Sequence, residues 1–135
     1  MESDKMNDCL FCKIINGDIP CFKVYEDELV LAFLDINPKS NGHTLIIPKK
    51  HFENLYEMEL EDLKEIEKAS QMVGKLLKEK LNCQGITRLQ NNEFGQDVKH
   101  YHMHLIPRYQ GAKFMLQTDK NNLLETQETF EKITQ

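Results

Sequence analysis

His100-Tyr101-His102-Met103-His104-Leu105-Ile106 is the stretch of this chain that says most about its fold and its chemistry. Histidines alternate with other, mostly apolar residues, and an alternation of period two predicts a half-buried strand. Side chains two residues apart on a strand point to the same face, so the three imidazoles form one row. Tyr101, Met103 and Leu105 then face the core, and we expect Pro107 to close the strand.

The row of three histidines has three interpretations. A purely structural strand explains one histidine better than three, because each imidazole needs a hydrogen-bond partner if it is buried. Histidines at i and i+2 can instead share a zinc ion. The third interpretation is catalysis: repulsion between charged rings keeps at least one imidazole neutral and nucleophilic while a neighbour carries a proton. That division of roles suits phosphoryl or nucleotidyl transfer.

The length of the chain indicates a single domain over residues 1–135. The chain has 17 basic and 22 acidic residues, and its net charge of −5 disfavours a broad nucleic-acid interface. We find no signal-peptide pattern and no apolar run that would span a membrane, so neither nucleic acid nor a membrane is an expected partner. Four cysteines without a secretory signal indicate thiols or metal ligands, and we expect a cytoplasmic protein.

The remaining patterns predict an α+β fold. Besides the histidine strand, apolar-rich runs predict strands at 22–26, 29–35, 43–48 and 85–90. Helical spacing of apolar residues predicts one long helix at 60–81, with short helices at 9–16 and 121–133 and a loop at 91–96. These elements favour an antiparallel sheet of about five strands, with a core at about 9–110 and a tail at 111–135.

Several separated motifs resemble the histidine triad (HIT) family of nucleotide hydrolases and transferases. In chain order they are Cys9-Leu-Phe-Cys12-Lys-Ile-Ile, Phe33-Leu-Asp35-Ile36-Asn37-Pro38, Gly42-His43-Thr-Leu-Ile-Ile-Pro48-Lys49-Lys50-His51, Gly95-Gln96-x-Val98 and His100-x-His102-x-His104. The resemblance covers about residues 9–110 and is closest to zinc-containing members of the bacterial type. It implies a HIT-like fold, a homodimer, and cleavage of a phosphoanhydride or phosphoramidate at the α-phosphate of a purine nucleotide such as AMP.

The resemblance assigns roles to the histidines. His102 would attack the α-phosphorus and form a covalent nucleotidyl-histidine that water then hydrolyses, so that two displacements replace one difficult step. His104 would donate a hydrogen bond to the same phosphate, and His43 matches a fourth histidine near it. His100 completes the triad. From the residues alone, His104 also fits a solvated strand end, and His43 also fits a core position.

A nucleotide pocket is implied as well. Asp35 would accept hydrogen bonds from the ribose hydroxyls, which a carboxylate does well, although the residue also suits a turn. Ile36 would line the base pocket with Phe11 and Phe33, and all three are equally typical of a core.

The leaving-group side departs from the family pattern. Asn91, Gln96 and the backbone around Asp97 would contact phosphate oxygens or the leaving group, but the loop at 91–96 is about two residues shorter than usual. Family members often have Ser or Thr at the position of Asp97. A carboxylate is unfavourable beside an anionic phosphate. Either Asp97 turns away, or the leaving-group preference differs.

Cys9-x-x-Cys12 has the spacing of half a zinc site. The pair supplies only two of the four ligands of a tetrahedral zinc site. Spacing does not choose the other two from the available residues, which are His43, His51, His100, Cys21 and Cys83. A redox motif is the alternative, but its usual strand context is missing. The resemblance selects His51 and His100, giving a closed structural zinc site and leaving Cys21 and Cys83 as buried thiols.

Three functions fit these observations. The first is the nucleotide hydrolase or nucleotidyl transferase described above. The second is a nucleotide-binding regulatory protein with little turnover, which the intact His102 and Gln96 disfavour. The third is a zinc hydrolase whose metal-bound water attacks the substrate, and this function would be lost on chelation.

Overall fold

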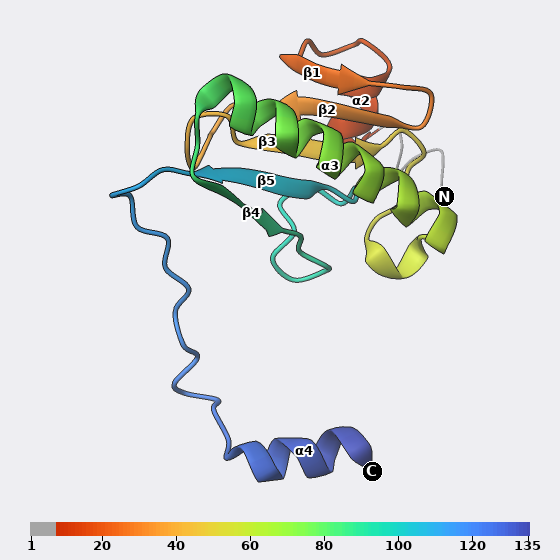
Figure 1. The fold of residues 1–135 in the computed structure, drawn as a ribbon. Coiled ribbons are helices and arrows are strands. Elements are labelled where there is room, and N and C mark those ends of the chain that lie inside the picture. Colours follow the sequence, from red (N-terminus) through yellow and green to blue (C-terminus); the bar gives the residue numbers. More distant parts are fainter. Residues whose placement is uncertain (1–7) are drawn as a thin grey trace.

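The computed structural model describes residues 8–135 and contains a five-stranded antiparallel sheet with helices on both faces (Figure 1). The elements in chain order are α2 (Leu10–Ile15), β1 (Lys23–Glu26), β2 (Val30–Leu34), β3 (Thr44–Pro48), the 3₁₀ turn η1 (Leu55–Glu57), α3 (Leu60–Leu81), β4 (Gly85–Leu89), β5 (Met103–Arg108) and α4 (Thr126–Thr134). The strand order is β1-β2-β3-β5-β4. The predicted α+β fold is therefore confirmed.

A tight turn joins β1 to β2. The Asp27 carboxylate accepts hydrogen bonds from the backbone N–H groups of Leu29 and Val30, at 2.8 and 2.9 Å. An aspartate that bonds to the backbone two or three residues on stabilises a turn locally. β2 then pairs with β3 over its whole length, from Val30 opposite Pro48 to Leu34 opposite Thr44.

The two faces of the sheet are covered by different helices. α3 begins with a capping box between Glu59 and Asp62 and ends at Asn82, which has a left-handed backbone. α3 packs on one face through a stripe of buried residues at helical spacing, which are Ile66, Ala69, Val73 and Leu77. Figure 1 shows α3 lying across the strands, with α2 on the other face.

The histidine strand differs from its predicted bounds. β5 starts at Met103, after His100 and His102, and continues through Pro107 to Arg108. The prediction that Pro107 closes the strand is wrong. The Pro107 carbonyl accepts a hydrogen bond from the Ser40 hydroxyl at 2.6 Å, whereas the next carbonyl, that of Arg108, bonds toward β4. The nitrogen and the carbonyl of one residue point to the same side of a strand, so the nitrogen of Pro107 faces Ser40 and not β4. The N–H that proline lacks is therefore not needed for pairing between strands.

The chain beyond β5 extends away from the sheet. Residues 110–135 contain no buried side chain, and α4 stands apart from the rest of the chain (Figure 1). The predicted helix at 121–133 starts later, at Thr126. Within residues 8–135, no helix combines the length and the apolar character needed to cross a membrane.

Candidate active site and metal centre

The face of the sheet opposite α3 carries the candidate functional residues. α2 packs there through Phe11 and Cys12 against buried apolar side chains of β2 and β3, which are Leu31, Phe33, Leu45 and Ile47. The residues of β5 alternate: Met103 and Leu105 join the α3 side of the core, together with Tyr101. The histidines therefore lie on the α2 side, as the alternation predicts.

A pocket of about 250 Å³ opens between α2, the turn after β2, and β5. His102 and His104 lie in its wall, together with Asp35 and Asp97. Much of the remaining lining is apolar and includes Phe11, Phe33 and the exposed Ile36. A mostly apolar pocket with a few convergent polar groups is typical of a small-molecule site.

His102 has a defined tautomer. Its Nδ1 lies 2.7 Å from the backbone carbonyl of His100, so this nitrogen carries the hydrogen and donates it. Nε2 is left with a lone pair. Phe11 packs edge-on against the His102 ring, with centroids 5.1 Å apart and planes at 85°, and fixes the ring further. The arrangement leaves a neutral ring with an oriented lone pair on Nε2.

His43 and His104 form a second hydrogen-bonded unit. The Lys39 N–H donates to His43 Nδ1 at 3.0 Å, so His43 carries its hydrogen on Nε2. That nitrogen lies 2.9 Å from His104 Nδ1 and donates to it. His104 is consequently protonated on Nε2 in its neutral form and can donate a hydrogen bond into the pocket.

Burial keeps these imidazoles uncharged near neutral pH. Desolvation lowers the pKa of His102, although the His100 carbonyl and the Asp97 and Asp35 carboxylates act in the opposite direction. Desolvation, with smaller contributions from His102 and His43, lowers the pKa of His104 to about 4. Desolvation also lowers the pKa of His43.

The cluster of Asp35, His43 and His104 also has ligand atoms within 4.8 Å of one another. Its hydrogen bonds disfavour a metal ion, however. To bind a metal ion, His43 Nε2 would need a free lone pair, so the ring hydrogen would have to lie on Nδ1. There it would point at the Lys39 N–H, and the hydrogen bond between them would be lost. A carboxylate 3.6 Å from His43 Nε2 instead stabilises that N–H, so the cluster is better suited to orienting His104.

A second cluster joins Cys9, Cys12, His51 and His100, all of them buried. His100 Nδ1 lies 3.4 and 3.6 Å from the sulfurs of Cys9 and Cys12, and His51 Nδ1 lies 3.3 Å from Cys12 Sγ and 3.2 Å from His100 Nδ1. Zinc bonds of about 2.3 Å to sulfur and 2.0–2.1 Å to nitrogen place tetrahedral ligands about 3.3 to 3.8 Å apart. The cluster therefore fits four-coordinate zinc closely.

The chemistry of the donors agrees with this geometry. His100 Nε2 donates to the Pro48 carbonyl at 2.8 Å, so the lone pair of its Nδ1 faces the two sulfurs. Burial lowers the pKa of His100 to about 4, leaving the ring neutral as a ligand must be. Burial and the adjacent Cys9 raise the pKa of Cys12 to about 12, so this thiol needs a bound cation to ionise near neutral pH.

Comparison with known proteins agrees with the fold and the triad. A family model described as the HIT domain matches residues 16–111. The chain belongs to the HIT domain family. Protein hit of Bacillus subtilis (strain 168) is 52% identical over 103 residues, which are 75% of this chain and 71% of that protein. The adenosine 5′-monophosphoramidase of Schizosaccharomyces pombe is 45% identical over 102 residues, 74% of each chain.

Solved HIT structures share the architecture of this HIT protein. A member of the family from Bacillus subtilis matches with a TM-score of 0.79 at 43% identity, over 93% of this chain and 94% of that one. A Zn-bound histidine triad family protein from Mycobacterium smegmatis matches with a TM-score of 0.77 at 35% identity, over 84% of each chain.

Two predicted pocket residues of this HIT domain lie elsewhere. Neither Asn91 nor Gln96 lines the pocket that holds His102. The buried Gln96 amide donates to the Glu53 carbonyl at 2.7 Å and accepts from the Glu93 N–H at 2.7 Å, which folds the loop at 91–96. The phosphate contacts assigned to Asn91 and Gln96 stay predictions.

The sequence left other pocket residues unassigned. Leu10 and Ile14 lie in the wall with Phe11, and helical spacing on α2 is the signal that would have found Ile14. Cys21, predicted to be a buried thiol, is half-buried and lines the same pocket, so that prediction is wrong. Cys83 is buried as predicted.

Proposed function

We propose that this HIT protein is a hydrolase that transfers a nucleoside monophosphate group to His102 and then to water. The observation that carries the proposal is the tautomer of His102, whose Nδ1 is committed to the His100 carbonyl at 2.7 Å while its neutral ring lies in the pocket wall. A neutral imidazole with a fixed lone pair is a good nucleophile toward phosphorus.

In the proposed reaction, His102 Nε2 attacks the α-phosphorus as the bond from phosphorus to the leaving group breaks. The leaving group takes a proton from solvent, and the imidazole becomes positively charged. The His100 carbonyl accepts the hydrogen bond from Nδ1 and so stabilises that charge. A water molecule then attacks phosphorus, releases the nucleoside monophosphate with loss of a proton, and restores neutral His102.

The other histidines would act on the phosphate without accepting the nucleotide. His104 Nε2–H would donate to a non-bridging oxygen, where negative charge increases in the transition state. His43 would hold His104 in the donating tautomer through their 2.9 Å contact. Gln96 and Asn91 would reach the leaving group only after the loop at 91–96 rearranges.

A purine nucleoside suits the other end of the pocket. Asp35 lies in its wall, with one carboxylate oxygen accepting the Asn37 N–H at 2.8 Å and further lone pairs available to ribose hydroxyls. Phe11 and Phe33 pack edge-to-face with centroids 5.5 Å apart, and with Ile36 they offer an apolar surface to a base.

Zinc would be structural in this protein. Cys9, Cys12, His51 and His100 supply four donors, which leave no position open for a catalytic water. When bound, the ion would fasten α2 to the segment that carries the nucleophile. This arrangement disfavours a zinc hydrolase with metal-bound water as nucleophile.

The decisive experiment traps the covalent nucleotide. Adenosine 5′-phosphoramidate is mixed with the protein, quenched within milliseconds, and analysed by peptide mass spectrometry. We expect one adenylyl group on His102. In His102→Asn, whose amide can still donate to the His100 carbonyl, we expect no adduct and at least about a thousand-fold loss of kcat.

Adenosine binding serves as the control for correct folding. His102→Asn should bind adenosine as the wild type does, because the base and ribose contacts lie on other residues. Full turnover in this variant would disprove the nucleophile, and tight binding without turnover in the wild type would indicate the regulatory protein instead.

A further inference from the structure

The pocket has an unusual charge balance for a site that receives phosphate. Its wall contains two carboxylates, Asp35 and Asp97, and two neutral histidines. Within residues 8–135 no lysine or arginine lines it. Sites that bind several phosphate groups normally supply cationic side chains, because unneutralised negative charges repel one another.

The two carboxylates are not equivalent. Asp35 accepts the Asn37 N–H and lies 3.6 Å from His43 Nε2, so its charge is partly balanced within the protein. Asp97 is exposed, and its carboxylate makes no hydrogen bond or ion pair in the part of the chain that the structure describes. Its charge therefore has no partner among the described residues and faces both the solvent and the pocket.

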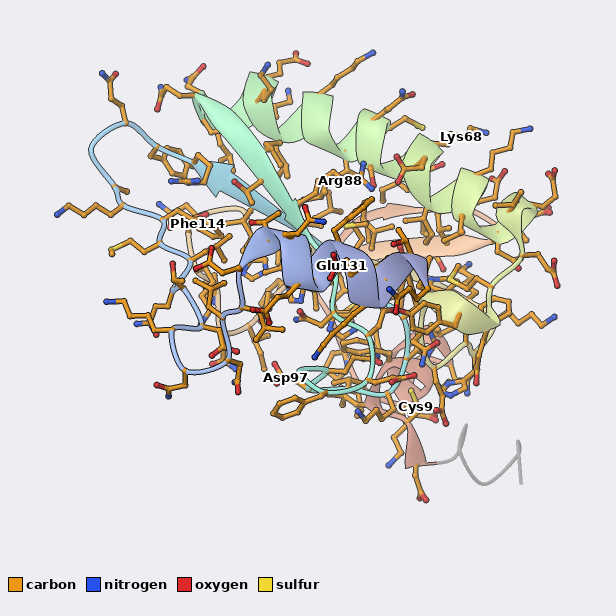
Figure 2. All side chains as sticks on the ribbon, turned by 90° about the horizontal axis from the view of Figure 1, so that it is seen from below. Cys9, Lys68, Arg88, Asp97, Phe114 and Glu131 are labelled. Atoms are coloured by element: carbon orange, nitrogen blue, oxygen red, sulfur yellow. The ribbon has the colours of Figure 1, made fainter. Side chains whose placement is uncertain are left out.

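A leaving group that extends from the pocket of His102 into an adjoining hollow would pass Asp97. Asp97 lines both the pocket and this hollow, which is bounded by Cys9, His51 and Glu53. Asp97 and Cys9 lie on the same side of the molecule in Figure 2. Among the described residues, the hollow is also bordered by two acidic side chains, Asp8 and Glu53, and by one lysine, Lys99. The Lys99 ammonium group donates to the Glu93 carbonyl at 2.9 Å.

We propose that Asp97 is a specificity-determining residue that selects the leaving group by its charge. The preferred substrates are nucleoside phosphoramidates whose amine bears a second, cationic group, and polyphosphate leaving groups are disfavoured. The inference rests on the proposed function. In the selected reaction the P–N bond breaks as His102 Nε2 bonds to phosphorus, and the departing amine takes a proton from solvent.

The test uses three adenosine 5′-phosphoramidates with four-carbon amines of different charge. The amines are 1,4-diaminobutane, which is cationic at its free end, butylamine, which is neutral, and 4-aminobutanoate, which is anionic. Values of kcat/KM are measured for the wild type and for the isosteric Asp97→Asn. Differences in intrinsic reactivity among the three substrates cancel when each ratio is compared between the two proteins.

We expect Asp97→Asn to lower the cationic-to-neutral ratio of kcat/KM about fivefold and to raise the anionic-to-neutral ratio by a similar factor. Fivefold is the upper end of the effect of exposed ion pairs. Both changes should shrink in 0.5 M salt, where the Debye length falls below about 5 Å. Glu79→Gln removes one exposed carboxylate from α3, outside the pocket, and should leave both ratios unchanged.

Failure of this proposal is distinguishable from failure of the proposed function. Equal ratios in the wild type and Asp97→Asn, with turnover of all three substrates, would overturn the role of Asp97 and leave the hydrolase intact. Absence of turnover of every substrate by the wild type would overturn the hydrolase itself. Adenosine inhibition, which involves no phosphate, should be the same in both proteins, and a loss of it in Asp97→Asn would show that the residue acts on pocket structure instead.

Discussion

Three histidines each have one ring nitrogen committed to a backbone group. His100 Nε2 donates to the Pro48 carbonyl, His102 Nδ1 donates to the His100 carbonyl, and His43 Nδ1 accepts from the Lys39 N–H. The opposite nitrogen is left with a lone pair in His100 and His102 and with a hydrogen in His43, which suits their proposed roles as metal ligand, nucleophile and donor. Identical side chains become unequal because the backbone fixes their tautomers.

The depressed pKa of His104 predicts a pH-dependent stability. His104 takes up a proton only near pH 4 in the folded protein, but near its ordinary value of 6.5 when unfolded. Below pH 6.5 the unfolded state therefore binds more protons, and the free energy of unfolding falls until about pH 4. We expect a slope of up to about 1.4 kcal/mol per pH unit from this group, measured by urea denaturation.

His104→Gln is the matched variant for that prediction. It removes the titration but retains an acceptor for the His43 N–H. Acid titration of the zinc cluster is common to both proteins and cancels in the comparison. The difference in unfolding free energy between wild type and variant should change between pH 6.5 and 4, and a constant difference over that range would contradict the assignment.

At the scale of elements, α2 joins the two sites. Cys9 caps its N-terminus and accepts the Cys12 N–H, while Phe11, between the two cysteines, contacts the rings of both His100 and His102. A six-residue helix is too short to be stable alone. Packing and the proposed zinc ion therefore have to hold this wall of the pocket in place.

Cys12→Ser should release the metal and loosen that wall. We expect zinc content, measured by elemental analysis, to fall from one per chain to well below one, and the Tm to fall by on the order of 10 °C. The affinity for AMP, measured calorimetrically, should fall by about tenfold, because α2 carries Phe11 and Leu10.

Cys83→Ser is the control for loss of a buried thiol. Cys83 is buried but lies outside the zinc cluster, so this variant should keep both its metal and its affinity for AMP. Zinc content of one per chain in Cys12→Ser would exclude the four-ligand site.

At the scale of the whole molecule, one chain leaves apolar surface uncovered. β4 is a sheet edge with β5 on its only paired side in the described chain. Apolar side chains of α3 are also exposed, among them Met72, Leu76 and Leu81. Such surface is typical of proteins that associate. We infer a homodimer in which the sheets and α3 helices of two chains join.

Light scattering after size exclusion should give twice the mass of the chain from 1 to 100 µM. A chain ending at Gly111 should remain dimeric, because the inferred interface lies on the sheet edge and α3. Dissociation of that shortened protein would assign the association to the tail, and a monomeric mass for the full chain at every concentration would exclude the dimer.

Local patterns predicted the elements but not all of their ends. Apolar spacing places the long helix at 60–81, and the structure has α3 over the same residues. The histidine strand was misplaced because alternation does not distinguish an extended segment from a paired one. His100 and His102 continue the alternation outside the ladder, and Pro107 is tolerated inside it because its nitrogen faces no partner strand.

Patterns along the chain are enough to select the residues proposed to carry the chemistry. Alternation places His100, His102 and His104 on one face of the sheet, and the Cys9-x-x-Cys12 spacing predicts half a zinc site, since both are properties of neighbours along the chain. How those residues differ from one another depends on contacts that form only in the folded chain. Pro48 lies 52 residues from His100, and His43 lies 61 residues from His104. The hydrogen bonds that fix these rings act through space, which periodicity along a chain does not encode.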